Sequence, residues 1–221
     1  MKNLSSYIEQ TNLKPIFTDA DVYQLVEDAA KYKFHGICLP PFWVKKAKRE
    51  ISGRDIALVT VIGFPLGYNM TETKMEEAKI ALNDGADELD MVMNISAFKA
   101  GMPWVKIEMA KLANLAHQND ALLKVIIETA YLSDDEIVKA CLICRDAGVD
   151  FVKTSTGFAA HGAKLEHIKL MRETLPITVG IKASGGIKDY KTAMKLIEAG
   201  ADRIGTSSGV SIVNEATIPN P

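Results

Sequence analysis

Eight short runs of β-forming residues alternate along this chain with longer amphipathic stretches. Strict alternation of near-continuous apolar strands with helices is typical of a parallel sheet that helices cover. Eight such units favour a closed barrel over an open doubly wound sheet, and no G-x-G-x-x-G follows the first run. We therefore expect one α/β domain over residues 1–221, a single (β/α)8 TIM barrel. The expected strands are Tyr7–Thr11, Gly36–Leu39, Ala57–Phe64, Glu88–Asn94, Leu123–Glu128, Asp150–Ser155, Thr178–Ser184 and Asp202–Thr206.

Composition narrows the class of protein. A chain of 221 residues with 48% hydrophobic and 24% charged residues suits one globular domain with a sizeable core. A net charge of −2 gives no basic footprint for nucleic acid or for an anionic membrane. No signal peptide is visible, and no apolar run approaches the roughly 20 residues of a membrane span. Three cysteines without an export signal favour a reduced, cytoplasmic protein.

The cysteines and histidines do not form a metal-binding pattern. Cys141 and Cys144 share one apolar face of a helical pattern over 133–147, so we expect them to pack in the core. The four histidines show no H-x-H or H-E-x-x-H spacing. We therefore expect neither a metal site nor a cofactor.

Two lysines occupy equivalent places in two apolar strand-like runs, Lys153 in Phe151–Ser155 and Lys182 in Val179–Ser184. A charge inside a buried strand is costly unless it is paired or functional. If the two strands are neighbours, the ammonium groups meet at one end of the sheet and each disfavours the charge on the other. A neutral amine is the nucleophile that forms a Schiff base with a carbonyl substrate. The alternative is that both lysines end exposed strands and extend into water.

A carboxylate lies in the fourth expected strand. Alternation places Asp90 on the same strand face as Glu88. A carboxylate inside a barrel needs cationic partners, and Lys153, Lys182 or Lys124 could supply them. Two hypotheses remain open here: a structural ion pair in the core, or a proton shuttle beside the reactive amine.

Glycine and hydroxyl residues follow the last three expected strands. Active sites of (β/α)8 barrels lie at the carboxyl ends of the strands, where Thr11 and Cys38 would also lie. Phosphate sites in these barrels commonly use the loops after strands seven and eight together with a helix N-terminus. Here Gly185-Gly186 follows the seventh run, and Gly205–Gly209 follows the eighth and opens a short helix. These loops predict a phosphate site, to which Thr154–Gly157 could add a third wall.

Six sequence phrases, spread over nearly the whole chain, form a recognisable set. They lie at Val61–Gly67, Glu88–Val92, Lys124–Thr129, Phe151–Gly157, Lys182–Ile187 and Arg203–Gly209. The most specific of them contain K-T-S-T-G and K-A-S-G-G, in that order. Together the six phrases resemble the 2-deoxyribose-5-phosphate aldolase family of class I aldolases.

The resemblance implies a metal-free aldolase that cleaves 2-deoxy-D-ribose 5-phosphate to acetaldehyde and D-glyceraldehyde 3-phosphate, in deoxyribonucleotide catabolism, and catalyses the reverse condensation. Lys153 matches the Schiff-base lysine, Lys182 the lysine that perturbs it and joins a proton relay, and Asp90 the aspartate of that relay. We expect the phosphate to contact Gly157, Gly185, Gly186, Ser207 and Ser208. We expect the surrounding residues to include Glu9, Thr11, Cys38, Lys124 and Thr154, and the protein to be a homo-oligomer, by preference a dimer.

The chain departs from the family pattern at two places. Family members usually carry an aspartate two residues before the threonine of the first strand, whereas this chain has Glu9-Gln10-Thr11. The tail 214–221 contains no tyrosine that could donate a proton. Two alternatives remain: another Schiff-base lyase or transaldolase-like enzyme acting on a phosphosugar, and a non-catalytic phosphosugar-binding barrel. The second alternative predicts the loss of a lysine or of the aspartate.

Overall fold

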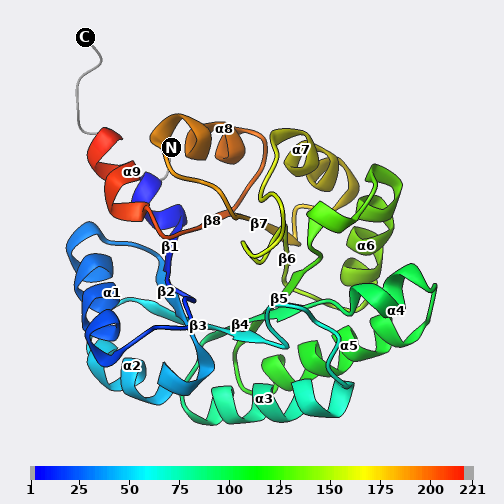
Figure 1. Cartoon of the computed structure of the whole chain (residues 1–221), viewed down its shortest axis with the longest axis horizontal. Helices are drawn as coiled ribbons and strands as arrows, with labels where there is room; N and C mark the ends of the chain where they lie inside the picture. Colours follow the sequence, from blue (N-terminus) through cyan, green and yellow to red (C-terminus); the bar gives the residue numbers. More distant parts are fainter. Residues whose placement is uncertain (1–2, 217–221) are drawn as a thin grey trace.

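The computed structural model describes residues 3–216, and its strands close into a parallel barrel. Each strand pairs with the next along the chain, and β8 pairs with β1 (Figure 1). This arrangement confirms the expected (β/α)8 barrel. The strands are β1 (Ile8–Thr11), β2 (Gly36–Leu39), β3 (Ala57–Ile62), β4 (Glu88–Val92), β5 (Leu122–Ile126), β6 (Phe151–Lys153), β7 (Gly180–Ser184) and β8 (Arg203–Thr206).

Helices form the outer ring of the barrel (Figure 1). The side chains of Ser133 and Glu136 cap the start of one of them reciprocally, as a helix N-terminus with unpaired N–H groups requires. Short 3₁₀ turns lie at Leu4–Tyr7, Pro41–Trp43 and Thr129–Tyr131. The helices are α1 (Asp19–Tyr32), α2 (Val44–Ile51), α3 (Thr71–Asn83), α4 (Ile95–Lys99), α5 (Trp104–His117), α6 (Asp134–Asp146), α7 (Leu165–Thr174), α8 (Tyr190–Glu198) and α9 (Gly209–Ala216).

The largest apolar cluster fills the space between the strands and the helices. Cys141 and Cys144 belong to it, and the Cys144 Sγ lies 3.8 Å from Sδ of Met109 on α5. Burial raises the pKa of the Cys141 thiol to about 12. The expectation that these cysteines pack in the core is confirmed. Within residues 3–216, none of the helices has the length and hydropathy needed to cross a bilayer.

Several strands end earlier than the sequence pattern predicted. The strand expected to run to Ser155 ends at Lys153, and the one expected to run to Asn94 ends at Val92. Beyond Lys153, the Thr154 backbone still bonds Lys182 O and the Thr129 N–H, and its hydroxyl adds bonds to Ser184 O and from Ser184 N. The expected strand was too long because Thr154 and Ser155 are fully buried although they lie outside it.

Candidate active site

The register of the barrel brings the expected catalytic residues together. Lys153 on β6 is paired with Lys182 on β7, and Asp90 on β4 is paired with Lys124 on β5. Side chains at paired positions share a sheet face, and these four meet inside the barrel. Lys153 is 2% exposed, and the other three are fully buried. The alternative that the two lysines extend into water is therefore wrong.

Asp90 is the hub of this group. Its Oδ2 accepts hydrogen bonds from Nζ of Lys153 at 2.8 Å and from Nζ of Lys182 at 2.6 Å, and its Oδ1 accepts from Nζ of Lys124 at 3.0 Å. Burial alone would raise the pKa of Asp90, but the three ammonium groups outweigh it and hold the pKa well below its ordinary value. Asp90 is therefore an ionised carboxylate in the resting site.

Lys182 has a second carboxylate partner. It also forms a buried ion pair with Glu9 on β1. Burial would lower the pKa of Lys182, but Asp90 and Glu9 outweigh it, so the pKa lies above its ordinary value. Lys182 is thus a fixed ammonium next to Lys153. Among residues 3–216, Lys153 has one carboxylate partner, Asp90, and it is the lysine of this group that reaches a cavity.

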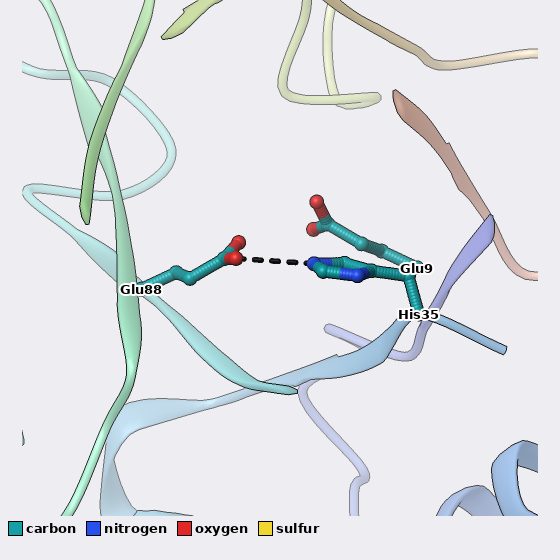
Figure 2. Close-up of side chains that lie close together, drawn as sticks. All are labelled: Glu9, His35 and Glu88. Carbon is teal, nitrogen blue, oxygen red and sulfur yellow. Dashed lines mark hydrogen bonds and ion pairs between the residues drawn. The ribbon is translucent and has the colours of Figure 1, made fainter. Parts of the chain in front are cut away.

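A further group of charges lies deeper in the barrel. Glu9, His35 and Glu88 converge from three segments far apart in the chain, and His35 Nε2 lies 3.1 Å from Glu88 Oε1 (Figure 2). The cation that the carboxylates share is the ammonium of Lys124, which pairs with Glu88, with Asp90 at 3.0 Å and with Glu9 at 3.6 Å. Burial opposes the charge of Lys124, but these carboxylates raise its pKa well above the ordinary value. We therefore read the group as an ion-pair network.

A cavity of about 280 Å³ opens at the carboxyl ends of the strands, with Lys153 in its lining. Four of the five residues expected to bind phosphate line the same cavity: Gly157, Gly185, Gly186 and Ser207. The fifth, Ser208, follows directly, and its N–H donates to Thr206 Oγ1 at 2.9 Å. A larger groove of about 920 Å³ lies at the amino end of the barrel. Lys124, Lys153 and Lys182 do not line it.

The remaining expected residues take different positions. Thr11 lines the cavity, and its hydroxyl donates to Glu9 O at 3.0 Å. Cys38 is buried on β2 against Val59 and Val61, and burial raises its pKa to about 11. Thr154 ties β6 to β7 through Ser184, so it supports the cavity wall and is not part of its lining.

Three residues that shape the site were not predicted from the sequence: Lys14, Lys188 and Glu128. Lys14 and Lys188 are exposed at the rim of the cavity. Lys188 lies two residues after the glycine pair, so its place near the predicted phosphate site could have been inferred. Lys14 lies in the loop after β1, where no motif indicated a site. Glu128 has a left-handed φ of 52°, and its Oε2 accepts from the Thr156 N–H at 3.0 Å and from the Thr156 hydroxyl. Glu128 therefore anchors the wall that Thr156 contributes.

Comparison with known proteins adds independent information. A family profile described as DeoC/LacD family aldolase matches residues 7–215. A deoxyribose-phosphate aldolase of Thermococcus kodakarensis is 50% identical over 218 residues, which cover 97% of each chain.

Solved structures of aldolases have the same fold as this chain. An aldolase called QR15 superimposes with a TM-score of 0.92 at 43% identity, covering 98% of this chain and 96% of the other. A deoxyribose phosphate aldolase from Aeropyrum pernix, described as a unique tetramer, has a TM-score of 0.90 at 36% identity and covers 96% and 90%.

Proposed function

We propose that this chain, which belongs to the DeoC/LacD family of aldolases, reversibly cleaves 2-deoxy-D-ribose 5-phosphate to acetaldehyde and D-glyceraldehyde 3-phosphate. The observation that carries the proposal is the position of Lys153. Its amine lies at a cavity, next to an ionised carboxylate and a second lysine that stays charged. An amine in such surroundings is suited to form a Schiff base.

In the proposed reaction, Lys153 acts first as the nucleophile and Asp90 then accepts a proton. The Lys153 amine attacks C1 of the open-chain sugar, and loss of water gives a protonated imine. The C2–C3 bond then breaks while the C3 hydroxyl gives up its proton, for which Asp90 is the acceptor. The electron pair of the broken bond moves toward the iminium and leaves an enamine. Protonation of the enamine at C2 and hydrolysis release acetaldehyde and restore the amine.

Lys182 keeps the charges of this cycle in place. Its ammonium shares Oδ2 of Asp90 with Lys153, so it competes for the carboxylate that would otherwise hold Lys153 as an ammonium. When Asp90 is protonated during the cycle, the adjacent Lys182 can pass the proton on by releasing one of its own as it takes that proton up, so that it remains an ammonium. Lys182 therefore both perturbs the nucleophile and belongs to the relay.

We propose that the substrate phosphate binds the glycine and serine loops of the same cavity. Backbone N–H groups of glycine loops and serine hydroxyls are good donors to phosphate, and cations at the rim add attraction. The exposed Lys14 and Lys188 supply that charge. The proposed contacts are Gly157, Gly185, Gly186, Ser207 and Ser208.

The alternatives are weaker. A non-catalytic sugar-phosphate binder would be expected to lose a lysine or the aspartate, but Lys153, Lys182 and Asp90 are all present and in contact. Another Schiff-base enzyme would use the same lysine and would differ in its products.

We further propose that the protein acts in the cytoplasm, in deoxyribonucleotide catabolism, as a homodimer. Light scattering behind a size-exclusion column tests the dimer.

An assay of the purified protein tests the activity. With 2-deoxy-D-ribose 5-phosphate, we expect acetaldehyde and D-glyceraldehyde 3-phosphate to form in equal amounts, each measured by a coupled dehydrogenase. Lys153→Met should abolish both products, while Lys195→Met on the exposed face of α8 should not. Release of another product pair would assign the protein to a different Schiff-base reaction, and no turnover would favour the binding protein.

A further inference from the structure

Gln10 lies directly between two residues of the site but faces the other way. Glu9 and Thr11 point toward the barrel interior and the cavity, so alternation along β1 turns Gln10 toward the outer layer. There it is 6% exposed and lies beneath the start of α9, which packs beside β1 (Figure 1). Gln10 therefore does not line the cavity.

The Gln10 amide bonds the loop between β8 and α9 at two points. Its Oε1 accepts from the Gly209 N–H at 2.9 Å, and its Nε2 donates to Ser207 O at 3.4 Å. The loop needs a donor and an acceptor on one side chain of this length, and a carboxamide supplies both. Glutamate would lack the donor, and methionine would lack both.

The packing at Gly209 shows how closely the loop fits against β1. A Cβ at this position would lie 2.5 Å from Gln10 Oε1 and 2.9 Å from Cγ2 of Ile8. A side chain there would displace the amide, so the contact between the loop and β1 depends on both residues.

The same loop is also held to its neighbour. The Thr206 hydroxyl donates to Ile187 O at 2.7 Å, which ties the β8 loop to the loop after β7, and accepts from Ser208 N. Between the Thr206 bond and the Gln10 bonds lies Ser207, which is exposed and lines the cavity. The Gln10 amide and the Thr206 hydroxyl therefore hold the backbone around Ser207 together.

We propose that Gln10 is a positioning residue for phosphate: it holds the Ser207–Gly209 loop against β1 so that the loop faces the cavity, and it thereby sets the preference for phosphorylated over unphosphorylated substrates. This inference rests on the proposed function. Gln10 has no proposed part in the chemistry, because the residues that carry it, Lys153 and Asp90, lie on β6 and β4.

The test separates phosphate recognition from chemistry. In Gln10→Met the volume is kept and both hydrogen bonds are lost, so the KM for 2-deoxyribose 5-phosphate should rise about fivefold to tenfold, as expected for one or two hydrogen bonds. Binding of inorganic phosphate, measured by calorimetry, should weaken to a similar extent. The kcat/KM for unphosphorylated 2-deoxyribose should stay within about twofold, as should the rate of borohydride trapping with acetaldehyde.

Two further variants and a control complete the experiment. Gln10→Asn, whose amide is one methylene too short, and Gly209→Ala, whose methyl group displaces the amide, should lower phosphate affinity in the same way. Gln24→Met is the control, because Gln24 bonds Asp28 on the exposed side of α1. If Gln10→Met does not fold, Gln10→Asn and Gly209→Ala carry the test.

The outcomes distinguish this inference from the function it rests on. Equal losses on both sugars, or unchanged affinity for inorganic phosphate in the Gln10 variants, would overturn the role of Gln10 even if the enzyme is an aldolase. Absence of sugar cleavage by the unmodified protein would overturn the proposed function, whereas the calorimetry would still report on Gln10.

Discussion

Lys153 and Lys182 occupy paired positions on adjacent strands and donate to the same atom, Oδ2 of Asp90, at 2.8 and 2.6 Å. One carboxylate oxygen therefore serves two ammonium groups, and a proton can leave one of them without leaving that oxygen unpaired. Lys182 has a second carboxylate in Glu9, whereas Lys153 is the one that reaches the cavity. These contacts support the proposal that Lys153 is the nucleophilic amine.

Removing the second ammonium should make the first harder to deprotonate. In Lys182→Leu, Asp90 no longer shares its Oδ2, so it holds Lys153 more firmly as an ammonium. We expect imine formation to require a higher pH than in the unmodified protein. The pH dependence of borohydride trapping measures it, with Lys195→Leu on α8 as the control. A profile that matches the unmodified protein would mean that Lys182 does not activate Lys153.

Neutralising the shared carboxylate should separate imine formation from bond cleavage. Asp90→Asn keeps the shape of the side chain but removes the carboxylate that we propose as the proton acceptor. Imine trapping should survive in part, while cleavage of the sugar should fall by about 10²- to 10⁴-fold. Single-turnover kinetics with the sugar phosphate, followed beside trapping with acetaldehyde, resolve the two steps. Equal losses in both would make Asp90 a structural ion-pair partner and no more.

Lys124 should matter mainly for stability. Its ammonium is fully buried and pairs with Asp90, Glu9 and Glu88, so Lys124→Met leaves these carboxylates short of a cation. We expect a loss of about 3–5 kcal/mol in the free energy of unfolding. Urea titration measures it. The control is Lys106→Met, whose exposed pair with Asp146 should be worth at most about 1 kcal/mol. Similar losses in both variants would show that the buried ion pairs of Lys124 contribute no more to the free energy of unfolding than an exposed pair does.

The same network predicts how stability depends on pH. Burial raises the pKa of Asp90 and of Glu88, but the neighbouring cations, Lys124 foremost, outweigh it, so both groups bind protons less readily when folded than when unfolded. Their contribution is present above the ordinary carboxyl values near 4 and is lost as the pH falls below them.

Urea titrations between pH 7 and pH 3 check this dependence. The free energy of unfolding should fall steeply below about pH 4 in the unmodified protein. The fall should be shallower in Glu88→Gln, which cannot bind the extra proton. An identical slope in the two proteins would rule out Glu88 as a source of the acid sensitivity.

The barrel and its central residues were accessible from sequence because local signals coincide there. Several strands are short, largely apolar runs, so a lysine or aspartate inside one is conspicuous, as Lys153, Lys182 and Asp90 were. Strand ends were less well predicted. Thr154 and Ser155 stay buried after the strand has ended at Lys153, and the sequence does not distinguish such a buried loop from a strand.

Contacts that join distant segments could not be read from the chain. Glu9, His35 and Glu88 meet only because β1, β2 and β4 close into one barrel, and no spacing rule connects them. The direction of Gln10 was hidden for a related reason. Alternation predicts that it faces away from Glu9, but only the folded structure places Gly209 and Ser207 within reach of its amide.

Borohydride trapping followed by peptide mapping tests the central claim most directly. The protein is incubated with acetaldehyde or with 2-deoxyribose 5-phosphate, reduced and digested, and the modified lysine is located by mass spectrometry. We predict a single reduced adduct on Lys153, absent in Lys153→Met and retained in Asp90→Asn. An adduct on Lys182 or Lys124, or no adduct in an active enzyme, would contradict the assignment of Lys153 as the nucleophile.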